Sequence, residues 1–248
     1  MLIPHFINQN NHLKYFKGID FNRSLFWHSQ LIFLKEWVVM AQNKPIVKKF
    51  HLFLLLIVVI VLIWSLIKPL SYSSWAADGG PIFICLIIVI ATYHRFRFTT
   101  LSYIIIAILV IIEFIGAHYT FAKVPLFDWI KDKFDLKRND YDRFGHLMKG
   151  MAIIIVREII VRKTQIQKGA WLFFFSFTTI MMIASLYEIV EMLSYKIAKG
   201  TQVAKGFLGM QGDRWDAEWD MTMALIGSLL SYIIFVRLHN KLLAKIRK

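Results

Sequence analysis

The chain has 248 residues, of which 57% are hydrophobic and 15% aromatic, and its formal net charge is +14. Soluble domains average roughly 45–50% apolar residues, so a higher content gathered in several long runs indicates a protein that crosses a membrane several times. The single cysteine, Cys85, excludes an internal disulfide framework and a cysteine-based zinc site. The positive charge comes with no nucleic-acid recognition motif, so we expect no nucleic-acid partner and assign the charge to the ends of membrane helices.

Residues 1–49 differ from the rest and are expected to form an amino-terminal cytoplasmic segment. Residues 1–24 lack the continuous apolar core of a signal peptide, and the stretch that follows them is able to form a short amphipathic helix on the membrane. A second interpretation is that the natural protein begins at Met40, because residues 35–37 can be encoded by a bacterial ribosome-binding sequence. The amino-terminal mass of the natively expressed protein tests this hypothesis, and a mature protein that starts earlier excludes it.

Six apolar stretches are predicted to cross the membrane as helices, since a spanning helix needs about 20 residues. The second is short and extends into the preceding WAADG, and the fourth is interrupted by Lys149, Arg157 and Glu158. We therefore expect an all-α fold, a polytopic membrane helical bundle of about six transmembrane helices over residues 50–238, with a basic cytoplasmic tail at 239–248. The six expected spans are residues 51–67, 80–94, 99–117, 144–161, 170–193 and 219–237.

Basic residues at the ends of the spans predict how the chain crosses the membrane. With six crossings, the basic clusters before the first span, after the second, between the fourth and fifth and after the sixth fall on one side, and they contain almost no acidic residues. The loops on the opposite side mix basic residues with many Asp and Glu. We therefore expect both termini in the bacterial cytoplasm and the polar loops 118–143 and 194–218 at the outer face of the inner membrane.

Two spans end in acidic residues on this expected outer face. Glu113 lies near the end of the third span, with His118 and Tyr119 just beyond it. Glu188 and Glu191 are three residues apart near the end of the fifth span and so face the same way. An acid inside a span is costly and usually faces partners or water. The alternative interpretation is an ordinary pair of solvated helix ends with interfacial His and Tyr.

The sequence KRNDYDRFGHLMKG leads into the fourth span. Asp140 is expected to cap that helix. Asp142 and His146 are four residues apart and therefore share one helical face. A carboxylate in this position orients the imidazole of a histidine and tunes its charge, which suits a proton relay or a metal ligand. The alternative is a capped helix start followed by interfacial anchors.

The sequence QGDRWDAEWD opens the sixth span. Asp213, Asp216 and Asp220 follow the i, i+3, i+7 spacing of one helical stripe. Trp215 and Trp219 are four residues apart on another face, as expected of aromatic residues at a membrane interface. Acids at a helix start are also ordinary caps, but this explains only one or two of them.

Four stretches in this order resemble the YjdF family of bacterial inner-membrane proteins. They are EFIGAHYTFAKVPLFDWI, RNDYDRFGHLMKG, LYEIVE and FLGMQGDRWDAEWDMTMALIG. The resemblance covers about residues 50–237, and its acidic motifs are long and specific. It implies a helical membrane protein, and the family brings no established activity.

A more distant similarity is to VanZ-like proteins, small membrane proteins associated with reduced susceptibility to teicoplanin, a glycopeptide that acts on the envelope. They have an Asp/His pair at the start of one helix, then a Glu near the end of another, then an Arg/Asp-containing segment at the start of the last. The Asp142/His146 pair, Glu188 and the acids of QGDRWDAEWD follow that order. The longer loop before the fourth span and the Trp-rich acidic motif depart from the pattern.

Together these features favour a polar site at the outer face that binds, or binds and modifies, an envelope lipid or a lipid-linked headgroup. The motifs GxSxG, GKS/T, HExxH and CxxC are absent, and whether the protein is an enzyme stays open. The alternatives are a non-catalytic scaffold with structural ion pairs, and a small transporter or ion pathway with relay groups at Glu113, Glu158 and Asp220. The catalytic candidates are His146, Asp142 and Glu188; the substrate-binding candidates are Arg143, Arg214, His118, Tyr119, Trp215 and Trp219; and the candidate ligands for a divalent metal are Asp213, Asp216, Asp220 and Glu191.

Overall fold

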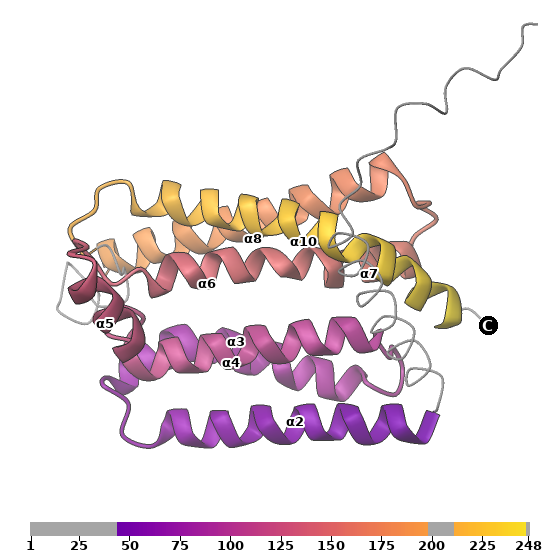
Figure 1. The fold of residues 1–248 in the computed structure, drawn as a ribbon, viewed down its shortest axis with the longest axis horizontal. Helices are drawn as coiled ribbons and strands as arrows, with labels where there is room; N and C mark the ends of the chain where they lie inside the picture. The colour runs from indigo at the N-terminus through magenta and orange to yellow at the C-terminus, as the bar shows by residue number, and fades with distance from the viewer. Residues whose placement is uncertain (1–43, 198–210, 247–248) are drawn as a thin grey trace, which may run out of the picture. The chain divides into compact units, whose positions relative to one another are not determined.

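A computed structural model of the chain describes residues 44–197 and 211–246, and the question of a start at Met40 lies outside them. Every regular element in these ranges is helical, which confirms the all-α class. From Lys48 onward the described residues belong to one compact unit. Five of its helices are long and apolar enough to cross a membrane (Figure 1): α2 (Lys44–Leu66), α3 (Tyr72–Thr92), α4 (Thr100–Tyr119), α8 (Ala170–Ile197) and α10 (Asp216–Ile246).

The fourth expected span, 144–161, is not a single long α-helix. The segment instead contains α6 (Tyr141–Lys149), the 3₁₀-helix η1 (Gly150–Ala152) and α7 (Ile153–Lys163), which follow one another without a loop. At the junction the N–H of Gly150 donates to the carbonyls of His146 and Met148, so the α-helical pattern tightens there. In Figure 1, α6 and α7 continue in one direction beside α8 and α10. Helix length in the described residues therefore gives five candidate spans, where the sequence predicted six.

Glycines allow a close crossing between α10 and the junction of α6 with η1. A Cβ atom on Gly227 of α10 would overlap the carbonyl group of Leu147, and a Cβ atom on Gly150 would overlap the backbone N of Ser228. Small residues let membrane helices approach in this way. Asp220 lies two helical turns before Gly227, so the crossing holds the start of α10 beside α6.

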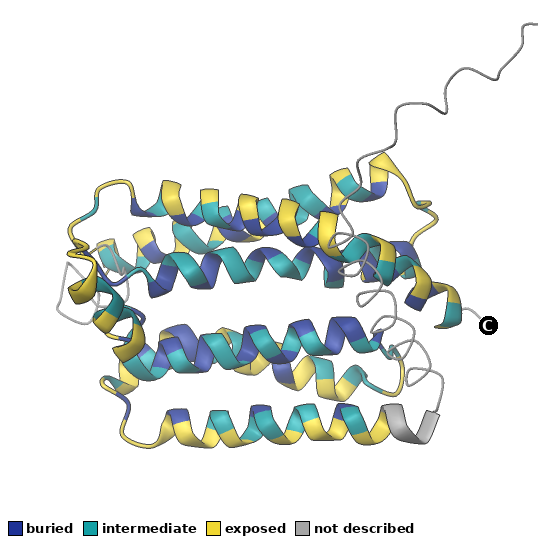
Figure 2. Cartoon of the chain, viewed as in Figure 1, coloured by how far each residue is buried: buried dark blue, intermediate teal, exposed yellow. Residues whose placement is uncertain are grey.

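The helix α4 is the most buried of the candidate spans and packs between α3 and α6. Phe114 of α4 packs with Leu86 of α3 and Val58 of α2 in one apolar cluster. The outer side chains of α2 are exposed aliphatic residues such as Leu52 and Leu56, and Figure 2 shows buried positions concentrated on the inner helices. Exposed apolar helix faces of this extent suit lipid as the surrounding medium.

The helix α5 (Pro125–Lys133) lies between α4 and α6 and is amphipathic. Pro125 occupies its first turn, where a missing N–H costs nothing. The side-chain amide of Asn139 donates to the Val124 carbonyl at 3.1 Å and to Asp128 Oδ1 at 3.0 Å. These bonds fix the chain just before α6. They therefore help to position Arg138, which precedes α6, and Arg143, which lies in its first turn.

Candidate functional site

Acidic side chains from five helices and the segment before α10 meet at one end of the unit. They come from the first halves of α3, α6 and α10 and from the second halves of α4 and α8. We call this group the acidic cluster. It has eight carboxyl groups and three basic groups: Asp78, Glu113, Asp142, Glu188, Glu191, Asp213, Asp216 and Asp220, with Arg138, Arg143 and Lys149.

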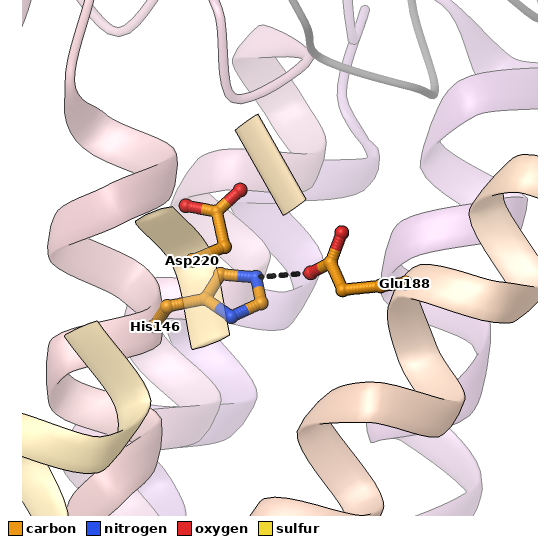
Figure 3. A group of neighbouring side chains, drawn as sticks. All are labelled: His146, Glu188 and Asp220. Carbon is orange, nitrogen blue, oxygen red and sulfur yellow. Dashed lines mark ion pairs between the residues drawn. The ribbon is translucent and has the colours of Figure 1, made fainter. Parts of the chain in front are cut away.

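His146 lies at the centre of the acidic cluster. Its Nε2 atom is 3.6 Å from Glu188 Oε1 and 3.8 Å from Asp142 Oδ1, and only 2% of the side chain is exposed. Figure 3 shows His146, Glu188 and Asp220 converging from α6, α8 and α10. Within the described residues, His146 Nδ1, Glu188 Oε1 and Asp220 Oδ1 are buried without a hydrogen-bond partner. Buried polar atoms normally have one, so this convergence suits a ligand.

Two overlapping sets of side chains have the geometry of a metal site. Ligand atoms of His146, Glu188 and Asp220 all lie within 4.8 Å of one another, and so do those of Asp142, Asp216 and Asp220. Carboxylate oxygens suit magnesium or manganese, and an added imidazole suits manganese or zinc. Asp220 belongs to both sets and is the residue on which either metal arrangement depends.

Asp213 and Glu191 were predicted as metal ligands and belong to neither of these sets. Asp213 precedes α10, where the N–H of Trp215 donates to its carboxylate at 2.9 Å. This bond, with a second from Arg143, lowers the pKa of Asp213 below its ordinary value. The Asp213 carboxylate is therefore charged at neutral pH and fixes the start of α10. Glu191 is buried one helical turn beyond Glu188.

Two arginines tie the start of α10 to the start of α6. Arg138 pairs with Asp216, both side chains being 6% exposed, and Arg143 pairs with Asp213. Asp140 was predicted to cap α6, but its side chain makes no capping hydrogen bond. Its carboxylate instead lies 3.5 Å from Arg138 Nε and 3.4 Å from Arg143 Nη1, since two cations attract it more strongly than the helix end.

The sequence analysis did not include Arg138 among the candidate site residues, although it is the first residue of the RNDYDRFGH motif. It also did not include Asp78, which could have been recognised as an acidic residue within the mostly apolar helix α3. Asp78 is 6% exposed and interacts electrostatically with Asp142 and Glu113. Lys149, which interrupts the fourth expected span, lies with its Nζ 3.3 Å from Glu113 Oε1.

The predicted substrate-binding residues fall in two places. Trp215 and Trp219 are 51% and 46% exposed on the outward face of α10, consistent with their spacing. The guanidinium of Arg143 lies 5.5 Å from the ring centre of Trp219, and that of Arg214 lies 4.8 Å from Trp215. These four residues form an aromatic and basic rim beside the acidic cluster.

His118 and Tyr119 do not join the acidic cluster through any contact of the described residues. His118 Nδ1 is 3.0 Å from the carbonyl oxygen of Ser65, and its ring stacks on Trp64 at 4.4 Å. Tyr119 is 6.0 Å from the same Trp64 ring. These two residues connect the end of α4 to α2.

A second buried carboxylate, Glu158, lies at the opposite end of the unit. Its oxygens accept hydrogen bonds from the Thr99 N–H at 2.9 Å, the Ser102 hydroxyl at 2.6 Å and Arg162 at 2.8 Å. His239 Nε2 lies 3.2 Å away. Glu158 therefore joins α4, α7 and α10 with its hydrogen-bonding capacity used within the chain, which is the behaviour of a structural group.

Comparison with known proteins agrees with this architecture. Residues 50–241 match the family described as "Predicted membrane protein (DUF2238)". The inner membrane protein YjdF of Escherichia coli (strain K12) is 33% identical over 187 residues, which cover 75% of this chain and 88% of that protein. No solved structure matches. These similarities confirm the predicted resemblance to YjdF, and the chain belongs to the DUF2238 family as a membrane protein with several transmembrane helices.

Proposed function

We propose that the acidic cluster holds a divalent cation and, through it, the phosphate of an envelope lipid or a lipid-linked headgroup at the outer face of the inner membrane. The observation that carries this proposal is the convergence of His146, Glu188 and Asp220 from three helices, each with a buried polar atom that lacks a hydrogen-bond partner. A cation at this point would take one ligand atom from each of the three residues.

The charges of the acidic cluster support a cation. Eight carboxyl groups face three basic groups, and two of the basic groups, Arg138 and Arg143, are paired with Asp216 and Asp213. Carboxylates are tolerated together away from water only when protons or cations neutralise them. Protonation would remove the charge, but it would not give His146, Glu188 and Asp220 a common ligand.

The residues take separate roles in this proposal. Asp220, with His146 and Glu188, holds the cation, and Asp142, whose Oδ1 lies 3.8 Å from His146 Nε2, orients the imidazole. Arg214 and Trp215 on the exposed rim contact the headgroup, since guanidinium groups pair with phosphate.

The proposal includes the orientation of the chain. Six crossings require α6, η1 and α7 to act as one span, which is supported by their uninterrupted succession over residues 141–163. The basic ends of α2, α7 and α10 would then lie in the cytoplasm with both termini, and the acidic cluster would lie outside. A relation to VanZ-like proteins is part of the same proposal, and its support is the meeting of the Asp142/His146 pair with Glu188 and Asp220.

A non-catalytic scaffold is the second candidate function. It is favoured by the ion pairs of Arg138 with Asp216 and of Arg143 with Asp213, which join segments far apart in the sequence. These two pairs leave His146, Glu188 and Asp220 without a role. The scaffold interpretation therefore explains the edge of the acidic cluster and not its centre.

A relay across the membrane through Glu113, Asp220 and Glu158 has less support. Between the acidic cluster and the buried Glu158 at the opposite end, the fully buried positions of the described residues include Ile153, Ile154 and Ser228. The Ser228 hydroxyl donates to the Ala224 carbonyl of its own helix at 2.7 Å. Since the two isoleucines carry no exchangeable proton and Ser228 bonds within its own helix, these described residues do not connect the two ends.

The test uses the full-length protein, stripped of metal in mild detergent and titrated with Mn²⁺. Elemental analysis and the Mn²⁺ paramagnetic resonance spectrum measure binding. We expect tight stoichiometric binding to the unsubstituted protein and at least a tenfold weaker affinity in Asp220→Asn and in His146→Ala. Two controls on the same motif, Asp213→Asn and the exposed Glu218→Gln, should bind normally, because neither residue belongs to the metal sets.

The headgroup is tested with the same samples. A soluble short-chain phosphatidylglycerol is added, and the ³¹P relaxation rate of its phosphate is measured. Bound Mn²⁺ should accelerate this relaxation in the unsubstituted protein and not in Asp220→Asn. Absence of Mn²⁺ binding, or equal binding by Asp220→Asn, rejects the cation site and favours the scaffold. Mn²⁺ binding without accelerated relaxation rejects the lipid headgroup.

A further inference from the structure

The unit contains an apolar cavity far from the acidic cluster. It lies between α2, α3 and α4 and has a volume of about 340 Å³, which is within the range of roughly 300–1,000 Å³ typical of ligand pockets. Its walls are mainly aliphatic side chains, among them Leu55, Val89 and Ile106. The cavity is at the end of the unit where α2 and α4 begin and α3 ends, opposite to the site described above.

The depth of the cavity corresponds to one leaflet of a bilayer. It extends along α2 from Lys48 at its mouth to Val58, which is 3% exposed and packs with Leu86 and Ala107 as its floor. Ten helical residues cover about 15 Å, which is half of a hydrocarbon core of about 30 Å. The outer face of α2 is apolar and exposed, with Leu56 at 55%, so the medium around this cavity is lipid.

The mouth of the cavity is basic. Lys48 and His94 line it and are exposed, and Arg95 is the exposed neighbour of His94. The described residues from Lys48 to Ile112 include one acid, Asp78, and it belongs to the acidic cluster at the other end. His51 is not free to bind a ligand, since its ring nitrogens lie 3.0 Å from the Tyr93 hydroxyl and 3.1 Å from the Thr100 hydroxyl. Among the described residues, the basic side chains left at the mouth to meet a headgroup are thus Lys48 and His94.

We propose that this cavity binds one acyl chain of an anionic phospholipid from the leaflet at the amino end of α2, with the phosphate at Lys48 and His94. The cavity length and apolar walls fit a single lipid tail, and the basic mouth selects the headgroup, because lysine and arginine near a membrane surface attract anionic lipids. The lipid fills the space between α2 and the α3–α4 pair and so fixes the position of α2.

The experiment exchanges the full-length protein into mild detergent and incubates it with equal amounts of phosphatidylglycerol and phosphatidylcholine that have identical acyl chains. Native mass spectrometry counts the retained lipids. Val89→Trp fills the cavity, and Val190→Trp, on the exposed face of α8, makes the same change where no cavity lies. Leu55→Trp fills the cavity from α2, and it replaces Val89→Trp as the cavity variant if Val89→Trp does not elute as a monodisperse protein.

We expect one phosphatidylglycerol per chain in the unsubstituted protein and in Val190→Trp, and at least a fivefold lower occupancy in the cavity variant. Replacing the mouth residues in Lys48→Gln/His94→Gln should remove the preference for phosphatidylglycerol. The proposal is overturned by no retained lipid, by equal retention of both lipids by the unsubstituted protein, or by an unchanged occupancy in a well-folded cavity variant. Retention of detergent in place of lipid also overturns it, since the basic mouth would then select nothing.

Discussion

Gly227 of α10 lies so close to the carbonyl group of Leu147 in α6 that no methyl group fits between them. This contact sets the distance between the two helices that provide Asp220 and His146. A site that depends on acids from separate helices therefore depends on a glycine two turns away from it.

Gly227→Ala should lower the free energy of unfolding by roughly 1–3 kcal/mol, the usual cost of overpacking a core. The physical reason is that the new Cβ meets backbone atoms, which cannot rotate away. The measurement is thermal unfolding in detergent. Gly80→Ala is the matched control, because nothing lies within 4 Å of the Cβ it adds and alanine stabilises a helix by roughly 0.5–1 kcal/mol over glycine. Equal melting temperatures for the two variants would contradict the close crossing.

Arg138→Gln should destabilise the protein strongly, because it leaves the buried carboxylate of Asp216 without its cation. Removing one partner of a buried ion pair costs about 3–5 kcal/mol. Adding Asp216→Asn to the same chain should recover much of this loss, since the second change removes the unpaired charge. Metal-free protein is used, so that no cation replaces the arginine. A double variant as unstable as Arg138→Gln alone would show that the pair acts through packing.

Glu158→Gln should lower the free energy of unfolding by about 1–3 kcal/mol, the cost of leaving buried polar groups unsatisfied. The amide turns one acceptor oxygen into a donor, and the groups facing it, including the Thr99 N–H and the Ser102 hydroxyl, are themselves donors. The exposed Glu218→Gln is the control and should leave the melting temperature unchanged. If Glu158 were instead a relay group, stability would hold and only a transport activity would fall.

We expect the contribution of Asp213 to the stability of the fold to depend on pH. Its pKa is lowered in the folded protein, first by the N–H of Trp215 and then by Arg143. A group with a lowered folded pKa stabilises the fold above its unfolded pKa, close to 3.8, and this contribution disappears as the pH falls through the folded pKa. The melting temperature of Asp213→Asn should therefore be below that of the unsubstituted protein at pH 7, and the difference should shrink as the pH falls below 3.8 and through the folded pKa. A difference that does not shrink with this acidification would assign the effect to geometry and not to charge.

The amino-acid sequence determined the features that depend on neighbours along one helix. Apolar runs predicted the positions of α2, α3, α4, α8 and α10, because a helix in lipid must be apolar over its length. The predicted ends are less accurate, since α2 and α3 begin seven and eight residues earlier and α10 ends nine residues later than the expected spans. The spacing of QGDRWDAEWD correctly separated the exposed Trp215 and Trp219 from the buried Asp216 and Asp220, since residues three and four apart share a helical face.

Tertiary structure alone decided which side chains meet. Asp140 binds two arginines in place of a cap, His118 contacts Ser65 of α2, and Asp78 joins the acidic cluster from α3. Spacing along one helix cannot reveal these contacts, because they depend on how the helices are rotated and how closely they approach. Here that approach is fixed by pairs of small residues such as Gly150 and Gly227, whose importance appears only when the facing backbone is known.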